Sequence, residues 1–184
     1  MIYADTLQLI AHLPARQPAP ALPSRLGILF HRLALSPDAD TATQAEEQIW
    51  DAWMYHTHEG AERALDLAVR DMAAQRWDLA ETRLTQLIRR RPDYAEAWNK
   101  RATLYYMLER DDESVRDMHR ALELEPRHFA AICSFAEILK ANGEVSAADF
   151  AFSTALRIHP HLPGVRDTLE ELRRPPSPPV PRPA

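Results

Sequence analysis

The 184 residues suffice for one domain with a hydrophobic core or for a short repeat array, and 4 glycines with 46% hydrophobic residues favour helices. A formal net charge of −5 gives no general attraction to nucleic acid or to anionic membranes. The single cysteine excludes an intramolecular disulfide and a cysteine zinc cluster, and no apolar run reaches the roughly 18 residues of a membrane span.

The first 23 residues, MIYADTLQLIAHLPARQPAPALP, join a short apolar run to a proline-rich stretch. A secretory signal peptide has a basic start and an unbroken apolar core. Here no Lys or Arg precedes the run, and Asp5, Gln8 and His12 interrupt it. We therefore expect residues 1–23 to form a flexible leader and the protein to be cytoplasmic. A periplasmic location is the alternative, if the segment is a degraded or mis-started signal.

Residues 24–57 are predicted to form two helices, separated by the segment SPDAD. Apolar residues in each recur at the spacing of one helix face. They are Leu26, Leu29, Phe30 and Leu33 in the first helix and Ala45, Ile49, Ala52 and Trp53 in the second. We interpret this segment as a degenerate helical hairpin that packs on the N-terminal end of the repeats described next. Its tryptophans, Trp50 and Trp53, are interpreted as packing anchors between hairpins.

Prolines mark a repeat in the centre of the chain, because Pro92, Pro126 and Pro160 stand 34 residues apart. Proline ends a helix, since it lacks a backbone donor and clashes with the preceding turn. Three aligned repeats follow, at residues 61–94, 95–128 and 129–162. Small residues recur at the eighth place (Ala68, Ala102, Ala136) and the twentieth (Ala80, Ser114, Ala148). They allow two helices to approach closely, and stacking of the hairpins then completes the core.

This pattern resembles the tetratricopeptide repeat (TPR), and the best copy is AWNKRATLYYMLERDDESVRDMHRALELEP. Signature places of that family hold Trp98, Ala102, Tyr105, Ser114, Met118, Ala121 and Pro126. Two departures are Asp71, where an aromatic residue is expected, and Arg101, which replaces a leucine. The sequence resembles bacterial TPR proteins in particular. This resemblance implies an all-α fold. It would be a right-handed α-solenoid of three TPR hairpins with the degenerate hairpin before it and a capping helix after it.

The C-terminal residues divide into a helix and a tail. Residues 163–174 are predicted to form a short capping helix with Val165, Leu169 and Leu172 on its apolar side. Residues 175–184, PPSPPVPRPA, are predicted to be a disordered proline-rich tail. An Arg-x-x-Pro-x-x-Pro pattern starts at Arg173, but such patterns arise by chance in proline-rich tails.

The resemblance also implies a partner-binding groove, because TPR proteins contact ligands mainly through the concave surface of their first helices. The corresponding residues include Glu62, Leu65, Asp66, Val69, Glu96, Asn99, Lys100, Thr103, Tyr106, Cys133, Ser134 and Glu137. We expect Asn99, Lys100 and Tyr106 to contribute most, since they present an amide, a positive charge and a large ring on one helix. In the alternative, Lys100 only offsets acidic neighbours and Tyr106 packs between repeats.

One TPR subgroup binds the terminal carboxylate of chaperone tails through lysine, asparagine and arginine at set places. Four of these places hold Leu65, Val69, Ala130 and Ser134 here, and Lys100 stands where an asparagine is expected. The sequence therefore disfavours binding of chaperone tails.

No catalytic motif is present, so we expect a protein that is not an enzyme and that has no cofactor and no metal site. His56 and His58 point to different sides of a helix, which favours a solvated helix end over a metal pair. Cys133 lacks an evident base and is interpreted as a packing residue. The run Arg89-Arg90-Arg91 is interpreted as a solvated helix end, with an acidic partner or nucleic acid as the alternative.

The sequence thus favours a protein–protein interaction scaffold that binds a peptide or helix of an unidentified partner in the groove, and it predicts no nucleic-acid and no membrane partner. The alternative is a non-catalytic structural or assembly subunit that associates through its end hairpins. Its partner in such an assembly could be a second copy of the chain, which would give a homo-oligomer.

Overall fold

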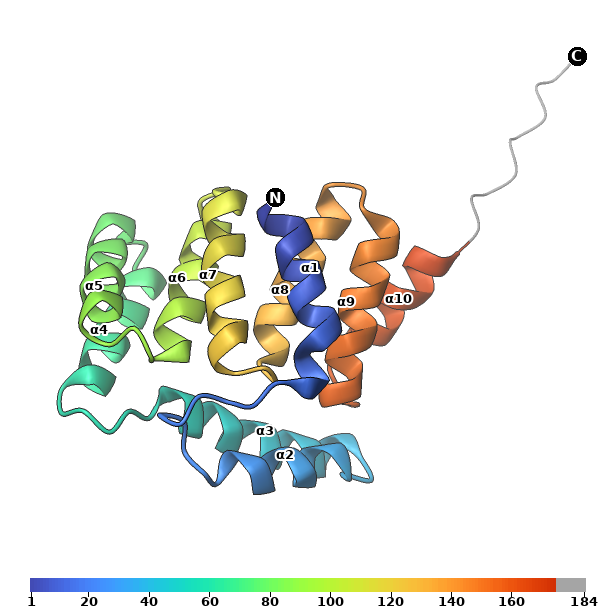
Figure 1. Cartoon of the computed structure of the whole chain (residues 1–184), viewed down its shortest axis with the longest axis horizontal. Helices are drawn as coiled ribbons and strands as arrows, with labels where there is room; N and C mark the ends of the chain where they lie inside the picture. The colour runs from blue at the N-terminus through green and yellow to red at the C-terminus, as the bar shows by residue number, and fades with distance from the viewer. Residues whose placement is uncertain (175–184) are drawn as a thin grey trace, which may run out of the picture.

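The computed structural model describes residues 1–174, and these residues contain ten α-helices and no strand (Figure 1). The predicted all-α fold is therefore confirmed, while the predicted tail at 175–184 lies outside the described residues. The helices are α1 (Ile2–His12), α2 (Leu26–Ala34), α3 (Ala39–Met54), α4 (Ala61–Ala73), α5 (Trp77–Arg90), α6 (Ala95–Met107), α7 (Asp111–Leu124), α8 (Phe129–Ala141), α9 (Val145–Ile158) and α10 (Val165–Arg173).

Helices α4 to α9 form three antiparallel hairpins, α4/α5, α6/α7 and α8/α9, which stand side by side (Figure 1). The small residues at the eighth and twentieth places are all buried. The Ser114 hydroxyl donates a hydrogen bond of 2.7 Å to the Ala102 carbonyl oxygen, so α6 and α7 approach closely at this point. Each second helix ends two residues before its proline, as expected for a residue that cannot continue a helix.

The two departures from the repeat pattern are paired with opposite charges inside their hairpins. Asp71 of α4 is buried and its Oδ2 accepts a hydrogen bond of 2.6 Å from Arg83 Nε of α5. Arg101 of α6 donates from Nε and Nη2 to both carboxylate oxygens of Asp117 in α7, at 2.6 and 2.9 Å. An ion pair thus joins the two helices in each of the first two hairpins.

The prediction of a flexible leader over residues 1–23 is wrong for residues 2–12, which form α1. This helix lies between α7 and α9 (Figure 1). Leu9, Ile10 and Leu13 are buried in the cluster that contains Met118 and Phe152. The polar residues that interrupt the apolar run all lie on the exposed side of α1: Asp5, Gln8 and His12. The interruptions are therefore the outer face of an amphipathic helix.

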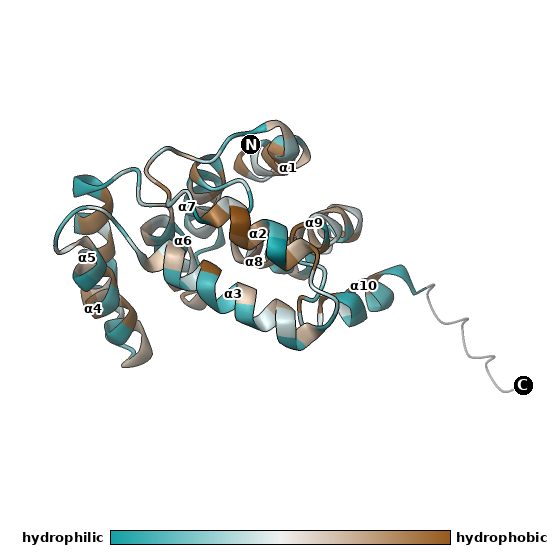
Figure 2. Ribbon diagram, turned by 90° about the horizontal axis from the view of Figure 1, so that it is seen from below, coloured by the Kyte–Doolittle hydropathy of each residue, from teal (hydrophilic) through white to brown (hydrophobic). Residues whose placement is uncertain are grey.

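The α2/α3 hairpin has the predicted apolar faces, and all eight of their residues are buried. Its predicted place on the N-terminal end of the array is wrong. The hairpin instead crosses the turn edge, the edge formed by the turns 91–94, 125–128 and 159–164 that follow the second helices (Figures 1 and 2). There it contacts α6 and α9. Phe129, at the start of α8, belongs to the apolar core of this hairpin, which explains the attachment at this edge.

Helix α10 packs on α9 at the far end of the array. Val165 and Leu169 are buried in the same cluster as Phe152, and Arg173 donates to both carboxylate oxygens of Asp149. The apolar side of α10 is thus buried against the array, and its outer side is polar.

The docking of α1 can be tested by substitution of Ile10, which is fully buried between α1 and the array. Because Ile10→Ala leaves a cavity, we expect it to lower the free energy of unfolding by about 2–4 kcal/mol. The control is Gln8, an exposed residue of the same helix. Gln8→Ala should change the free energy of unfolding by about 0.5 kcal/mol or less. Urea unfolding measures both, and equal small effects would show that α1 is detached in solution.

Candidate functional site

The turn-side end of the concave surface is held by a buried acid, Glu96. Glu96 Oε2 accepts a hydrogen bond of 2.8 Å from His128 Nε2, and Lys100 Nζ lies 3.0 Å from Oε1. The Ala131 amide donates to His128 Nδ1, which assigns the ring proton to Nε2. Burial raises the pKa of Glu96, but the His128 hydrogen bond and the Lys100 charge outweigh it and hold that pKa below its usual value.

The two tryptophans of α3 cover this buried acid from outside the array. The Trp53 ring stacks on His128 with 4.0 Å between ring centroids and an angle of 7° between planes. Trp50 contacts His128 edge-on, and its ring centroid lies 5.0 Å from Lys100 Nζ. The interpretation of both residues as packing anchors agrees with these contacts, although the surface they anchor to is the turn edge.

Two of the three residues expected to dominate binding are therefore engaged within the chain. Asn99 is buried, and its Nδ2 lies 3.3 Å from both carboxylate oxygens of Glu96. Lys100 is held between Glu96 and the Trp50 ring. Only Tyr106 is exposed, with 42% of its surface accessible, and its neighbour Met107 reaches 53%.

Toward the other end of the first helices, the predicted groove residues reach solvent. We call this region the concave strip and define it as Val69 of α4, Thr103, Tyr106 and Met107 of α6, and Glu137 of α8. Val69, Thr103 and Glu137 occupy the ninth place of the three repeats, and Tyr106 and Met107 occupy the twelfth and thirteenth places of the second. The first three are partly exposed and the last two are exposed. The strip offers an aromatic ring, a thioether and a carboxylate, which suits contact with a polypeptide.

The remaining predicted groove residues serve local contacts. Glu62 Oε1 accepts from the His56 amide, and Asp66 pairs with Arg70 at 2.9 Å. Leu65 is buried, while Cys133 and Ser134 are half-buried. Burial, with a smaller effect of the Glu137 charge, raises the pKa of the Cys133 thiol to about 12. A thiol with so high a pKa is a poor nucleophile, which supports the interpretation as a packing residue.

Several histidines attach the N-terminal hairpin, a role that sequence reasoning missed. His159 Nε2 lies 3.0 Å from Glu46 Oε2, and His161 Nε2 donates to the Ser36 carbonyl oxygen at 2.9 Å. The signal was present, since His128, His159 and His161 all lie within two residues of a repeat-ending proline. Among residues 1–174, no three His, Cys, Asp or Glu side chains gather as a possible metal site, and no helix has the length and apolarity to cross a membrane.

Comparison with known proteins identifies the repeat. Residues 95–128 match the tetratricopeptide repeat family model. A TPR repeat-containing protein of Rhizobium etli is 32% identical over 136 residues, which cover 74% of this chain and 67% of that protein. The chain belongs to the tetratricopeptide repeat family.

Solved TPR-fold structures show the same architecture at low identity. The first TPR of Spaghetti (RPAP3), bound to the HSP90 peptide SRMEEVD, aligns with a TM-score of 0.58 at 16% identity, over 62% of this chain and 90% of that one. The MamA protein aligns with a TM-score of 0.57 at 16% identity, over 82% of each chain. At 16% identity these similarities support the fold of this chain and nothing beyond it.

Removal of the Glu96 carboxylate should destabilise the protein strongly. Glu96→Ala leaves His128 Nε2 and Lys100 without their buried partner, so we expect a loss of about 3 kcal/mol or more in the free energy of unfolding. Glu137→Ala, which removes the partly exposed partner of Lys140, should cost about 0.5 kcal/mol or less. Thermal and urea unfolding measure both, and similar costs would contradict a structural role for Glu96.

Acid should weaken the same contact. The pKa of Glu96 is lower in the folded chain than its ordinary value of about 4.3. Its ionised form therefore contributes full stability above that value, and the contribution is lost as the pH falls through the folded pKa. Glu96→Gln removes this titration, so its unfolding free energy should decline less between about pH 5 and pH 3 than that of the wild type. Parallel declines would show that Glu96 does not supply the acid sensitivity.

Proposed function

We propose that this TPR protein binds a segment of a partner protein on the concave strip, centred on Tyr106. The observation that carries the proposal is that Tyr106 and Met107 are both exposed, at places of α6 that in the TPR family face the concave surface. At the other end of that surface, α3 already covers His128 and Lys100. A partner segment therefore has one open region to occupy, at the end away from the hairpin.

The chemistry of the strip supports a polypeptide ligand. Tyrosine supplies a large contact area with little loss of side-chain entropy, and methionine adapts to different apolar shapes. The protein-interaction role is general to the TPR fold, and one structural neighbour, the Spaghetti TPR, holds a peptide. The places that would grip a chaperone-tail carboxylate hold Leu65, Val69, Ala130 and Ser134, so the proposed ligand is a different peptide class.

The second candidate function is a structural subunit that associates through an end hairpin. The α2/α3 hairpin favours it, because Ile28 of α2 and Leu35, the residue that follows α2, are 67% and 68% exposed. Both candidates are non-catalytic, and a cytoplasmic location stays a prediction.

Substitution of the strip tests the leading proposal. The Tyr106→Ala/Met107→Ala double variant should retain its fold, because both side chains are exposed, and should lose the partner that the intact protein captures from its source cell. Quantitative comparison of captured proteins measures the loss, which we expect to be about tenfold or more for a hot-spot pair.

Two controls separate the candidate surfaces. Phe150→Ala removes an exposed aromatic residue from α9 and should leave capture unchanged. Ile28→Ser/Leu35→Ser alters the hairpin, and loss of the partner in this variant alone would assign the interaction to the second candidate surface.

A further inference from the structure

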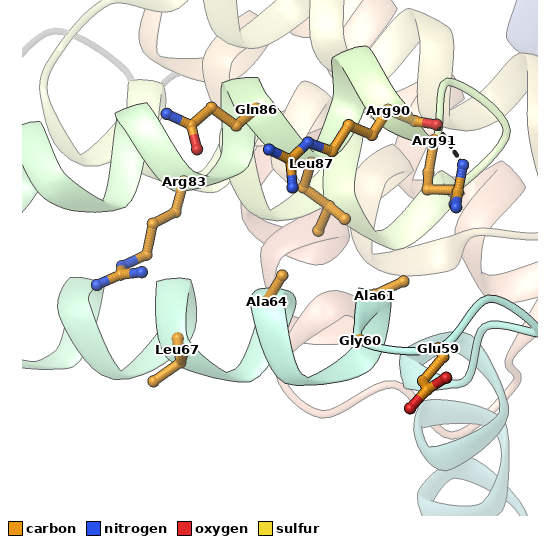
Figure 3. A pocket seen from close by; sticks show the side chains of 10 residues that line it. All are labelled: Glu59, Gly60, Ala61, Ala64, Leu67, Arg83, Gln86, Leu87, Arg90 and Arg91. Carbon is orange, nitrogen blue, oxygen red and sulfur yellow. Dashed lines mark hydrogen bonds between the residues drawn. The ribbon is translucent and has the colours of Figure 1, made fainter.

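The outer face of the first hairpin carries a hollow of about 330 Å³ (Figure 3). Its lining comes from α4, α5 and the turns beside them. The floor is apolar and contains Ala61, Ala64, Leu67 and Leu87. Leu67 remains 36% exposed. Ala64 is half-buried, whereas Ala61 and Leu87 are buried, so the apolar surface that reaches solvent belongs to Ala64 and Leu67 of α4.

The same face of the next two hairpins is covered by a helix. Helix α5 packs on α6, and α7 packs on α8. Trp98 and Ile132, which stand in their repeats where Ala64 stands in the first, pack against the apolar cluster of the preceding hairpin. The helix that precedes α4 in the chain is α3, and it lies on the turn edge with α2 and α6 instead. The first hairpin thus has the face that binds a preceding helix in the other two hairpins, but no helix of the described residues packs on it.

Arginines of α5 and of the turn after it line one side of the hollow. Arg83, Arg90 and Arg91 line it, against a single acid, Glu59 (Figure 3). Arg83 is held in place by the bond from its Nε to Asp71, and its terminal nitrogens donate to no other described residue. Arg91 Nη1 donates to the Arg90 carbonyl oxygen. The rim is therefore positively charged on a chain whose formal net charge is −5.

We propose that this face binds an acidic amphipathic helix of another protein, which takes the place of a preceding repeat. The apolar side of that helix covers Ala64, Leu67 and Leu87, and its carboxylates pair with Arg83 and Arg90. Arginine suits this role, because its fork of N–H donors matches a carboxylate and it is always charged. The small floor residues allow the backbone of the helix to approach closely.

A second copy of the chain offers a poorer occupant. Its own acidic helix, α10, exposes Asp167, Glu170 and Glu171 but buries Val165 and Leu169 in the core of the array. A copy stacked end to end would bring a polar surface to an apolar floor. A suitable occupant must carry acidic residues for the arginines and also an apolar side that is not already buried in its own protein.

The test uses the full chain and a synthetic amphipathic helix of the length of α5, 14 residues, with leucines on one side and glutamates flanking them. Fluorescence anisotropy measures binding, and methyl NMR locates it. We expect the peptide to shift the methyl signals of Leu67 and Leu87 and to leave that of Met107 on the concave strip unchanged. Binding should weaken as salt is raised, because exposed charges are screened.

Adjacent arginines provide matched variants. Arg90→Glu should weaken peptide binding about tenfold, since it reverses a rim charge. Arg89→Glu makes the same change one residue away, where the side chain lines a different hollow with Asp78 and Glu81, and should change binding less than about twofold. A peptide with lysines in place of the glutamates should not bind.

Four outcomes overturn the proposal. They are no binding of the acidic helix to the intact chain, equal effects of the two arginine variants, equal binding of a proline-containing acidic peptide that cannot form a helix, and methyl shifts confined to Met107. Concentration-dependent self-association that Arg90→Glu abolishes, measured by sedimentation, would assign the face to a second copy instead. The test is independent of the concave strip, because Tyr106→Ala/Met107→Ala should leave peptide binding unchanged.

Discussion

The stack of Trp53 on His128 determines which surfaces of the molecule are free. His128 lies between α7 and α8 and also donates to the buried Glu96 of α6, so one ring joins two hairpins of the array to α3. Because this contact, together with those of His159 and His161, holds the hairpin on the turn edge, α3 covers Lys100 and His128 at one end of the first helices. For the same reason it does not cover the outer face of α4 and α5. The open strip and the open end face are both consequences of one attachment.

The ion pairs inside the first two hairpins have opposite orientation. In the first, the acid Asp71 is on the first helix and Arg83 on the second, whereas in the second hairpin Arg101 precedes Asp117. If α4 paired with α7, two acids would meet, and if α6 paired with α5, two arginines would meet. Buried ion pairs add little net stability because of the cost of desolvation, but like charges in a wrong pairing are costly. We infer that these departures from the repeat pattern specify which helices form each hairpin.

The features predictable from sequence are those carried by local spacing. The 34-residue period, the helix ends before Pro92, Pro126 and Pro160, and the apolar faces of α2 and α3 depend on residues close together in the chain. The positions of α1 and of the hairpin depend on contacts between distant residues. Thr6 contacts His119 at 3.1 Å and Glu46 contacts His159 at 3.0 Å, each across 113 residues. No periodicity encodes such pairings, and for the same reason the burial of Asn99 could not be read from its place in the repeat.

The two proposed surfaces use different sides of α4. Val69 belongs to the concave strip, while Ala61, Ala64 and Leu67 face the hollow at the end of the array. Occupation of one surface therefore does not cover the other, and the rigid packing of α4 against α5 and α6 keeps them at a fixed separation. A partner that carries both an acidic helix and an exposed peptide segment would bind the second surface as an intramolecular step, at an effective concentration set by its linker. Two weak contacts, one on the first hairpin and one centred on the second, would then give a selective interaction, since a partner with only one of the elements would gain none of this advantage.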